Sequence, residues 1–123
     1  MDDERIWNFE RELWTGGADV YREKVADDCV MALPTDPFVM DGKAATEAVS
    51  HTPRWESVSI SHKHVSRPEH GLIVIAYRAE ATRESETYRA LCTSTLGKIK
   101  EENWEVMQHQ QAPLGIEDAD PDA

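Results

Sequence analysis

The spacing of hydrophobic positions changes along this chain from a helical period to a period of two. Between residues 3 and 14, Ile6, Phe9 and Leu13 fall on one stripe, with two tryptophans beside it. Such a stripe is typical of an amphipathic helix that covers a core with one face. From Trp55 onward, hydrophobic residues alternate with polar ones, as they do in half-buried strands. The pattern therefore predicts helices first and a sheet afterwards.

Two further helices and one strand precede that change. A pair of glycines ends the first helix, and Asp19 is positioned to cap a second, shorter helix. The segment A-D-D-C-V-M-A-L-P then predicts a short strand that stops at Pro34. Asp41 and the glycine after it open a third helix, which ends before Pro53.

The second half of the chain predicts a meander of four strands. The strand segments are S-V-S-I-S-H-K-H, G-L-I-V-I-A-Y-R-A-E-A-T, T-Y-R-A-L-C-T-S-T-L and W-E-V-M-Q-H-Q-Q, separated by R-P-E-H-G, R-E-S-E and K-E-E-N. Strands joined by such short loops pair antiparallel. Because the helices and the meander are segregated along the chain, we expect an α+β fold in which the helices cover one face of the sheet.

That covered face carries more polar side chains than a dry core would hold. Side chains alternate between the two faces of a strand, and loops with even numbers of residues keep paired residues on one face. Among aliphatic residues such as Val58, Ile60, Ile75 and Met107, the polar members of the covered face are Tyr77, Cys92, Ser94, His62, His64, His109 and Gln111. A buried polar group without a partner costs about 1 to 3 kcal/mol. These groups therefore either satisfy one another or line a cavity that holds water or a ligand.

The composition is that of a soluble domain with an acidic surface. The chain has 123 residues, enough for one core, and a formal net charge of -11. This charge disfavours binding to phosphate backbones, so no nucleic-acid partner is expected. No apolar run reaches the roughly 20 residues of a membrane span, and the acidic N-terminus lacks a secretory signal pattern; we expect a cytoplasmic protein with no membrane partner. Residues 1–114 form the predicted domain and residues 115–123 an acidic, disordered tail.

Neither the cysteines nor the histidines form a strong redox or metal motif. Cys29 and Cys92 are far apart and lack C-x-x-C spacing, so two buried free thiols are expected. His62 and His64 form an H-x-H pair that would place both rings on one side of a strand, and Glu69 follows at a spacing found in part of the cupin motif. Glu69 falls in a predicted turn, however, and the second cupin motif has no counterpart. We therefore expect neither a metal nor another cofactor.

The order of elements and several short motifs resemble the SnoaL-like members of the nuclear-transport-factor-2-like superfamily. The motifs are G-G-A-D between the first helices, A-D-D-C-V-M-A-L-P, Y-R-A-E-A-T-R in the long strand and the closing W-E-V-M-Q-H-Q-Q-A-P-L. The resemblance covers residues 3–114 and implies a cone-shaped α+β fold (a cystatin-like roll): a curved, mixed or antiparallel sheet, with N-terminal helices over its concave face and a pocket beneath them. It also implies a homodimer formed through the outer face of the sheet.

The resemblance does not imply one reaction. The superfamily includes ketosteroid isomerases, polyketide cyclases, dehydratases, epoxide hydrolases and non-catalytic binding modules. Ketosteroid isomerase-like sites use a tyrosine on the first helix and an aspartate at the end of the first strand, and the nearest positions here are Phe9 and Leu33. Both are apolar, whereas enolisation needs a phenolic donor and a carboxylate base. The nearby Asp36 is flanked by prolines and is better explained as a turn former.

His109 is the residue best suited to chemistry, because an imidazole can act as a general base or acid near neutral pH. A histidine that only orders its strand or binds water is the plainer interpretation. We take His109 and Tyr77 as the candidate catalytic residues. Trp55 and Trp104 are expected to pack at a strand edge or a dimer face, with stacking on a ligand as the alternative. The expected pocket-lining residues are Phe9, Leu13, Leu33, Ile60, His62, Ile75, Cys92, Ser94, Met107 and Gln111.

Two functions remain open at this stage, beside a third, metal-dependent catalysis at His62 and His64, that would require a bound ion. In the first, the protein binds a small, mostly apolar organic molecule in the cone and acts on it as a lyase, isomerase or hydrolase. In the second, it is a non-catalytic homodimeric module that binds a partner through its sheet or its acidic surface. The second function predicts a collapsed pocket and a large exposed apolar patch.

Overall fold

The computed structural model describes residues 1–114, which form three helices and six strands. The predicted tail, residues 115–123, lies outside the described residues. The helices are α1 (Asp3–Thr15), α2 (Ala18–Lys24) and α3 (Gly42–Val49). The strands are β1 (Val25–Ala32), β2 (Val39–Asp41), β3 (Ser57–Glu69), β4 (Leu72–Arg83), β5 (Glu86–Lys100) and β6 (Asn103–Pro113).

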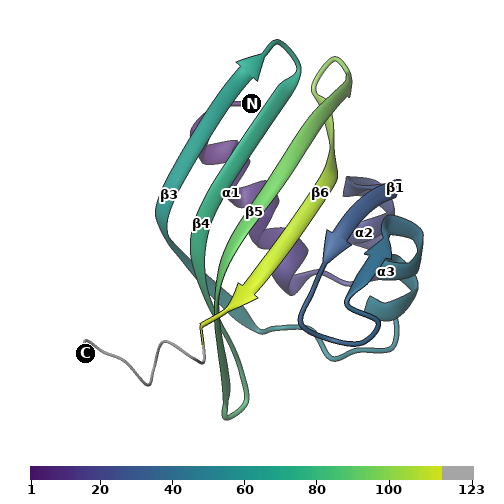
Figure 1. Ribbon diagram of the computed structural model, residues 1–123, viewed down its shortest axis with the longest axis vertical. Helices are drawn as coiled ribbons and strands as arrows, with labels where there is room; N and C mark the ends of the chain where they lie inside the picture. The colour runs from purple at the N-terminus through teal and green to yellow at the C-terminus, as the bar shows by residue number, and fades with distance from the viewer. Residues whose placement is uncertain (115–123) are drawn as a thin grey trace.

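All six strands belong to one sheet, in the order β2-β1-β6-β5-β4-β3. The four long strands form the predicted antiparallel meander, while β1 joins β6 in parallel and β2 pairs with β1. Figure 1 shows α1 lying across one face of the long strands, with α2 and α3 beside β1 at the other end of the sheet. This arrangement confirms the α+β class, with helices on one face. The short strand β2 was not predicted.

Aspartate side chains cap the N-termini of α1 and α3. Asp2 precedes α1, and its carboxylate accepts a hydrogen bond from the backbone N–H of Arg5 at 2.9 Å. Asp41 caps α3 in the predicted way, by accepting from the N–H of Ala44 at 2.8 Å. The predicted cap of α2 is wrong: Gly17 occupies the N-cap without a side-chain bond, and Asp19 lies inside the first turn, where its charge still favours the helix N-terminus.

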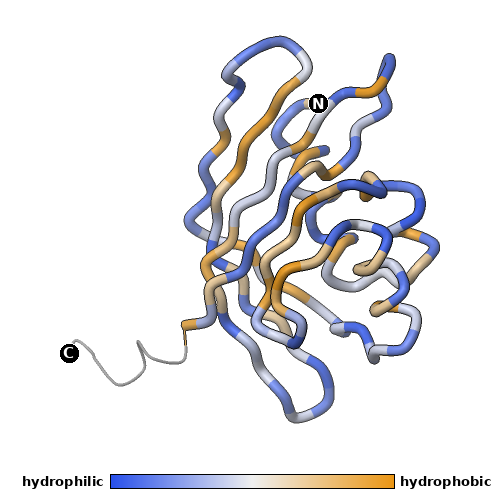
Figure 2. The backbone as a smooth tube through the Cα atoms, turned by 45° about the vertical axis from the view of Figure 1, so that its right-hand side comes forward, coloured by the Kyte–Doolittle hydropathy of each residue, from blue (hydrophilic) through white to orange (hydrophobic). Residues whose placement is uncertain are grey.

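The core lies between α1 and the covered face of the sheet. In Figure 2 the hairpin ends of the long strands are hydrophilic and their middles are more hydrophobic. The apolar stripe of α1 is buried as predicted, with Ile6 fully buried and Leu13 at 4% exposure. Against it pack inward residues of β4 and β5, including Ile73, Ile75 and Leu96. Burial of these side chains contributes roughly 1.5 to 3 kcal/mol each.

The predicted faces of β4 and β5 agree with the observed pairing. Tyr77 pairs with Cys92, and Ile75 pairs with Ser94, so all four side chains point toward the helices. On β6, His109 pairs with Ser94, and Gln111 pairs with Cys92. These two residues of β6 therefore also face the covered side.

Two β-bulges reverse the predicted direction of other side chains. On β3 the pairing with β4 shifts between Ser61 and His64, and His62 adopts a positive φ of 53°. The extra residues place His62 and His64 on the outer face, while Lys63 reaches the ring of Trp7. On β6 an unpaired residue, Met107, is inserted between the pairs formed with Thr95 and Leu96. Its side chain turns outward over Gly97 and is 49% exposed.

His62, His64 and Met107 were thus assigned to the wrong face. A strict period of two fails wherever a bulge adds a residue to one strand, because every side chain beyond the bulge changes face relative to that count. His109 and Gln111 keep the predicted face because a second register shift lies at the loop between β5 and β6, between Lys98 and Lys100. The two shifts cancel for the residues beyond Met107.

Both cysteines, Cys29 and Cys92, are free and buried, as expected. None of the helices in the described part of the chain has the length and apolar character needed to cross a membrane.

Candidate functional site

A cavity of about 740 Å³ opens at the end of the sheet where α2 and α3 stand. It is enclosed by the last turn of α1, the loop after β1, α3, the segment before β3 and the ends of β5 and β6. Its volume lies in the range of small-molecule sites. Of the predicted pocket residues, Leu13, Leu33, His109 and Gln111 line it.

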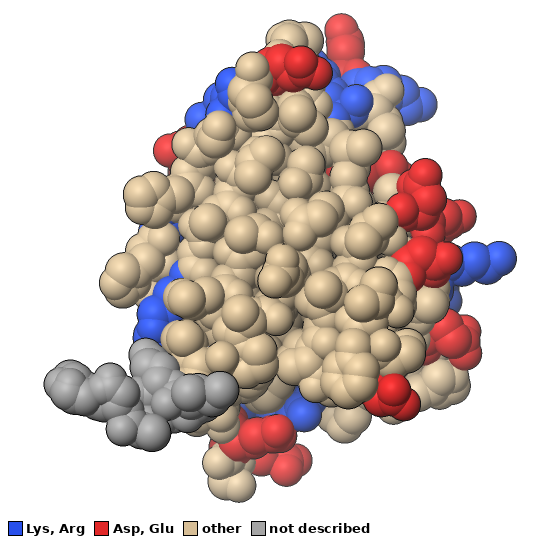
Figure 3. Space-filling model, viewed as in Figure 1, with Lys and Arg blue, Asp and Glu red and all other residues tan. Residues whose placement is uncertain are grey.

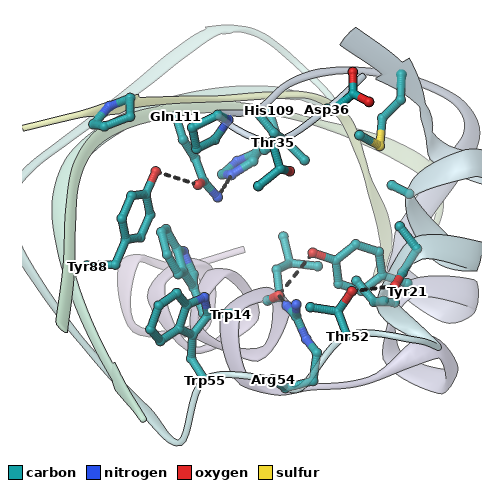
Figure 4. A pocket seen from close by; sticks show the side chains of 18 of the residues that line it. Trp14, Tyr21, Thr35, Asp36, Thr52, Arg54, Trp55, Tyr88, His109 and Gln111 are labelled. Atoms are coloured by element: carbon teal, nitrogen blue, oxygen red, sulfur yellow. Dashed lines mark hydrogen bonds between the residues drawn. The ribbon is translucent and has the colours of Figure 1, made fainter. Parts of the chain in front are cut away.

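One wall of the cavity is aromatic. Trp55 stacks on Tyr88 with ring centroids 5.7 Å apart and an interplanar angle of 14°, and Trp14 lies 6.1 Å from Tyr88 on another side. Figure 4 shows these three rings together, facing the open centre of the cavity. Trp55 lines the cavity, a position that agrees with the alternative in which it stacks on a ligand. Trp55 belongs to the segment between α3 and β3, just before the chain enters the sheet at Ser57.

Behind the cavity lies a buried carboxylate, Glu10, which the sequence analysis overlooked. Glu10 is fully buried on the sheet-facing side of α1. Its Oε2 atom accepts hydrogen bonds from the Tyr77 hydroxyl and the Ser94 hydroxyl, both at 2.6 Å. Trp14 donates its indole N–H to the Tyr77 oxygen at 3.0 Å. Such charge-assisted bonds offset part of the cost of burying an ionised group.

His109 connects this buried network to the cavity. Its Nδ1 atom lies 2.7 Å from Ser94 Oγ and 3.5 Å from Glu10 Oε2. Its Nε2 atom lies 3.1 Å from Gln111 Nε2, and the Gln111 carbonyl accepts from the Tyr88 hydroxyl at 2.9 Å. A continuous chain of hydrogen bonds thus runs from Trp14 in the core to Tyr88 at the cavity wall (Figure 4 shows its cavity end).

The direction of these bonds assigns the proton on the neutral imidazole. The Ser94 hydroxyl has one hydrogen, and it donates that hydrogen to Glu10. Ser94 Oγ can therefore only accept from His109, so the ring carries its hydrogen on Nδ1. The lone pair on Nε2 then accepts from the Gln111 amide. Nε2 is the ring atom free to exchange this partner for a ligand.

Burial and the charge of Glu10 hold the neighbouring acids in their protonated forms. Burial is the main cause, and Glu10 the next, that raises the pKa of Tyr77 well above its ordinary value. The same two causes raise the pKa of the Cys92 thiol to about 12. Neither group can supply an anion near neutral pH. A nucleophilic role for Cys92 is thereby disfavoured, since the thiolate is the reactive form.

Comparisons with known proteins identify the fold. No family model matches the sequence, and no curated protein matches it. A proposed ketosteroid isomerase from Parabacteroides distasonis matches the structure with a TM-score of 0.74 at 13% identity, over 89% of this chain and 86% of that one. An NTF2-like protein of unknown function from Rhodospirillum rubrum has a TM-score of 0.73 at 16% identity, over 91% and 98% of the two chains. A third, from Pseudomonas aeruginosa, has a TM-score of 0.70 at 20% identity, over 91% and 97%.

The chain adopts the nuclear-transport-factor-2-like (NTF2-like) fold. The cone-shaped arrangement expected from the sequence motifs is therefore present. At these identities the likeness defines the fold and leaves the function to the residues of the site.

Within this NTF2-like fold, α1 seals several predicted pocket residues away from the cavity. Ile75, Cys92 and Ser94 are buried in the core, as is the candidate catalytic residue Tyr77, and Ile60 is half-buried against them. Phe9 is also buried, beneath the ammonium group of Lys24, 4.5 Å from its ring centre. None of these residues is among those that line the cavity. Tyr77 does not contact the cavity itself; its hydroxyl is hydrogen-bonded to Glu10 and to Trp14.

Two residues at the first-helix and first-strand positions differ from the ketosteroid isomerase pattern, as the sequence indicated. Phe9 lies in the core, and Leu33 lines the cavity. A carboxylate from the next helical residue, Glu10, lies 3.5 Å from His109 but is buried behind the cavity and does not line it. Asp36 lines the cavity but is an exposed residue of the loop after β1.

Sequence reasoning missed Glu10, Trp14 as a donor, and Arg54 and Tyr88 at the cavity wall. A signal for Glu10 was present, because it lies three residues after Trp7 and three before Leu13, inside the buried stripe of α1. Arg54 gave no such signal, since it belongs to a segment without regular periodicity.

The H-x-H pair does not assemble a metal site in the described residues. His62 and His64 are exposed on the outer face of β3, and no group of three or more His, Cys, Asp or Glu side chains within residues 1–114 could hold an ion.

Proposed function

We propose that this protein binds a small, mostly apolar organic molecule in the cavity and that His109 transfers a proton to or from it. The observation that carries the proposal is the position of His109: one ring nitrogen is fixed by Ser94 and Glu10, and the other is directed to the Gln111 amide at the cavity wall. The aromatic surfaces of Trp14, Trp55 and Tyr88 offer an apolar bed for a ligand next to that nitrogen.

The buried network supports a role in proton transfer. An orienting group on one imidazole nitrogen fixes the tautomer and leaves the other nitrogen as the acceptor, which is the arrangement of a histidine general base. If Nε2 takes a proton from a ligand, the positive charge on the ring forms 3.5 Å from Glu10 in a buried environment. The attraction between opposite charges stabilises that state.

Isomerases, lyases and hydrolases all use such a proton transfer. The residues of the site support this shared step and do not select one of the three enzyme classes. Gln111 and Tyr88 are hydrogen-bond donors next to His109 at the cavity wall and are placed to stabilise an oxyanion that forms as the proton leaves.

Binding is tested with a neutral, polarity-sensitive dye such as prodan. We expect blue-shifted, enhanced emission with the wild-type protein and loss of that signal in Ala48→Trp, whose new side chain fills the cavity from α3. Lys43→Trp adds the same ring to an exposed position of α3 that does not line the cavity, and it should bind like wild type. Equal binding by Ala48→Trp and Lys43→Trp would place the dye elsewhere and contradict the proposal.

Proton transfer is tested with 2-acetylnaphthalene, whose methyl hydrogens are acidic. In D₂O the wild-type protein should accelerate exchange of these hydrogens, as followed by NMR, and His109→Gln should lower the protein-dependent rate by about 100-fold or more while still binding prodan. Exchange at equal rates in the two proteins would leave His109 without an acid–base role.

A second candidate function, a homodimeric module, is favoured by the outer face of the sheet, although the open cavity contradicts the collapsed pocket expected with it. Figure 3 shows a broad surface there with charged groups gathered at its rim. Leu91 and Met107 are 51% and 49% exposed on this face, and Leu91 borders a shallow hollow of about 340 Å³ together with His62 and Gln110. Light scattering should give the mass of a dimer for wild type and of a monomer for Leu91→Glu, with prodan binding retained. A monomeric wild type contradicts this function.

A further inference from the structure

One cationic side chain reaches the cavity without a carboxylate partner. Arg54 is half-buried and lines the cavity. Within residues 1–114 no Asp or Glu forms an ion pair with it. The other arginine at the cavity, Arg83, is already paired with Glu86 at 2.8 Å and lies over the ring of Trp55. Arg54 is therefore the uncompensated positive charge of this site.

Backbone groups hold the Arg54 guanidinium in one orientation. Its Nε donates to the carbonyl of Gly16 and its Nη2 to the carbonyl of Leu13, both at 2.7 Å, at the C-terminal end of α1. The ring of Tyr21 lies on one side, 5.5 Å from the guanidinium carbon. These contacts fix the position of the charge before any ligand arrives, which lowers the entropy cost of binding to it.

The two bonds occupy one edge of the guanidinium and leave another edge open. A guanidinium has five N–H groups. The edge formed by Nε and Nη2 is used by the two carbonyls, whereas the hydrogens of Nη1 and the second hydrogen of Nη2 have no acceptor among the described residues. The edge formed by Nη1 and Nη2 is a two-pronged donor that matches the two oxygens of a carboxylate.

The surroundings strengthen an interaction with a single negative charge. Apolar and aromatic side chains in the walls lower the polarity around Arg54, so a charge pair there is stronger than in open solvent. Among the described residues, the cavity lining has two carboxylates. Glu86 is paired with Arg83, and Asp36 is exposed and lies on the opposite side of the cavity from Arg54 in Figure 4. A dianion such as a phosphate monoester would leave one charge uncompensated in an apolar cavity of a protein with net charge -11.

We infer that the ligand is an organic monocarboxylate, whose carboxylate is chelated by the Nη1–Nη2 edge of Arg54. Its apolar body lies against Trp14, Trp55 and Tyr88, and its far end meets His109 and Gln111, which Figure 4 shows across the cavity from Arg54. Arg54 thus selects the substrate class for the proton transfer at His109. This inference rests on the proposed function, because it uses the same cavity.

The test compares two probes of nearly equal shape, 2-naphthoate and 2-acetylnaphthalene, which differ in a carboxylate against a methyl ketone. By calorimetry at low salt, wild-type protein should bind naphthoate at least about 10-fold more tightly than the ketone. Arg54→Gln should remove this preference by weakening naphthoate alone, and Arg54→Lys should keep part of it. Arg83→Gln, which removes a guanidinium already paired with Glu86, should retain the full preference.

Arg54 also binds two backbone carbonyls, so a variant at this position can fold poorly. The comparison of the two probes on the wild-type protein still tests whether the cavity prefers a carboxylate. Equal affinities for the two probes, or tighter binding of the ketone, overturn the carboxylate inference and leave the proposed function in place. If neither probe binds and prodan shows no cavity-dependent signal, the proposed function itself is overturned. A preference for naphthoate that survives in Arg54→Gln but not in Arg83→Gln assigns the anion to Arg83 and also overturns the inference.

Discussion

The residue that most constrains the site is Glu10, a fully buried carboxylate held by two hydroxyl groups. Its second oxygen, Oε1, has no hydrogen-bond partner among the described groups. A buried ionised group is costly, and a protein retains it only where its partners are in place. Glu10 therefore depends on Tyr77 and Ser94, and the hydroxyls of those residues depend on Glu10 as their acceptor.

Replacing Glu10 should separate the charge of the carboxylate from its role as acceptor. Glu10→Ala leaves two buried hydroxyls without an acceptor and a void beside α1, so we expect it to lower the free energy of unfolding by about 3 kcal/mol or more. Glu10→Gln keeps an acceptor of the same size and should cost clearly less. Urea unfolding measures both, with Glu12→Ala on the exposed side of α1 as control. A cost for Glu10→Ala no greater than for Glu12→Ala would contradict this account.

The tautomer of His109 gives a second residue-scale prediction, one that needs no ligand. In ¹H–¹⁵N spectra of the neutral side chain, His109 should carry its hydrogen on Nδ1, because Ser94 can only accept. Ser94→Ala should shift the population toward the Nε2 form. His51, whose Nε2 faces Glu47 at 2.9 Å, serves as the internal reference for the opposite tautomer. An Nε2 hydrogen on His109 in the wild type would refute the assigned directions.

At this scale the sequence predicted which residues share a face but not which of them meet. The alternation of side chains along the strands placed Tyr77, Ser94 and His109 on one face, and in the structure hydrogen bonds through Glu10 connect them. The spacing of α1 places Glu10 in the buried stripe, but it could not show that Glu10 meets these residues, since the contact joins a helix to strands 67 to 99 positions away along the chain. Charged residues on helices are mostly exposed, which is why the pattern of α1 was judged by its apolar members alone.

Among the elements, the helices followed the sequence closely, while β3 and β6 departed from it at their bulges. Caps and periodicity act within a few residues and are visible locally. A bulge depends on how two strands fit together, so the direction of His62 and Met107 could not be obtained by counting along either strand. The error affected the outer face, and the residues beyond the bulge of β6 kept their predicted direction.

The contact between α3 and β1 provides an element-scale prediction. Gly42 is the first residue of α3, and a Cβ atom there would lie 1.8 Å from the carbonyl oxygen of Ala26 on β1. Gly42→Ala must therefore push α3 away from the strand, and we expect a loss of about 2 kcal/mol or more in the free energy of unfolding. Gly17→Ala is the matched control, because a Cβ at Gly17 meets no atom within 4 Å. Equal stabilities of the two variants would show that α3 shifts without cost.

At the scale of the whole molecule, the position of the cavity depends on how far α1 extends over the inward face of the sheet. The inward residues of the sheet form one continuous face, but α1 seals the part that contains Tyr77 and Ser94. Beyond the end of α1, Tyr88, His109 and Gln111 face open space beside α3. The sequence predicted a pocket on this face from its excess of polar residues. It could not divide the face into sealed and open parts, because that division depends on where the helices lie in space.

The buried acids of this core predict how stability changes with pH. The pKa of Cys92 is raised from 9.0 to about 12, and burial also raises the pKa of Tyr77. Below pH 9 the thiol is protonated in both the folded and the unfolded protein. Between pH 9 and 12 the unfolded state releases this proton while the folded state retains it, so the free energy of unfolding must fall as pH rises through that interval.

Urea unfolding at pH 8 and pH 10.5 tests this expectation. The wild-type protein should be less stable at pH 10.5, and Cys92→Ala should show a smaller fall, since it removes one of the buried acids. The thiol should also react slowly with a maleimide in the folded protein at pH 8 and rapidly in urea, because the folded state holds it protonated and out of reach. Equal stability at the two pH values would mean that the core opens to water around Cys92 and Tyr77. In that case Glu10 would not be in the dry environment that makes its support of His109 effective, so this measurement also examines the basis of the proposed proton transfer.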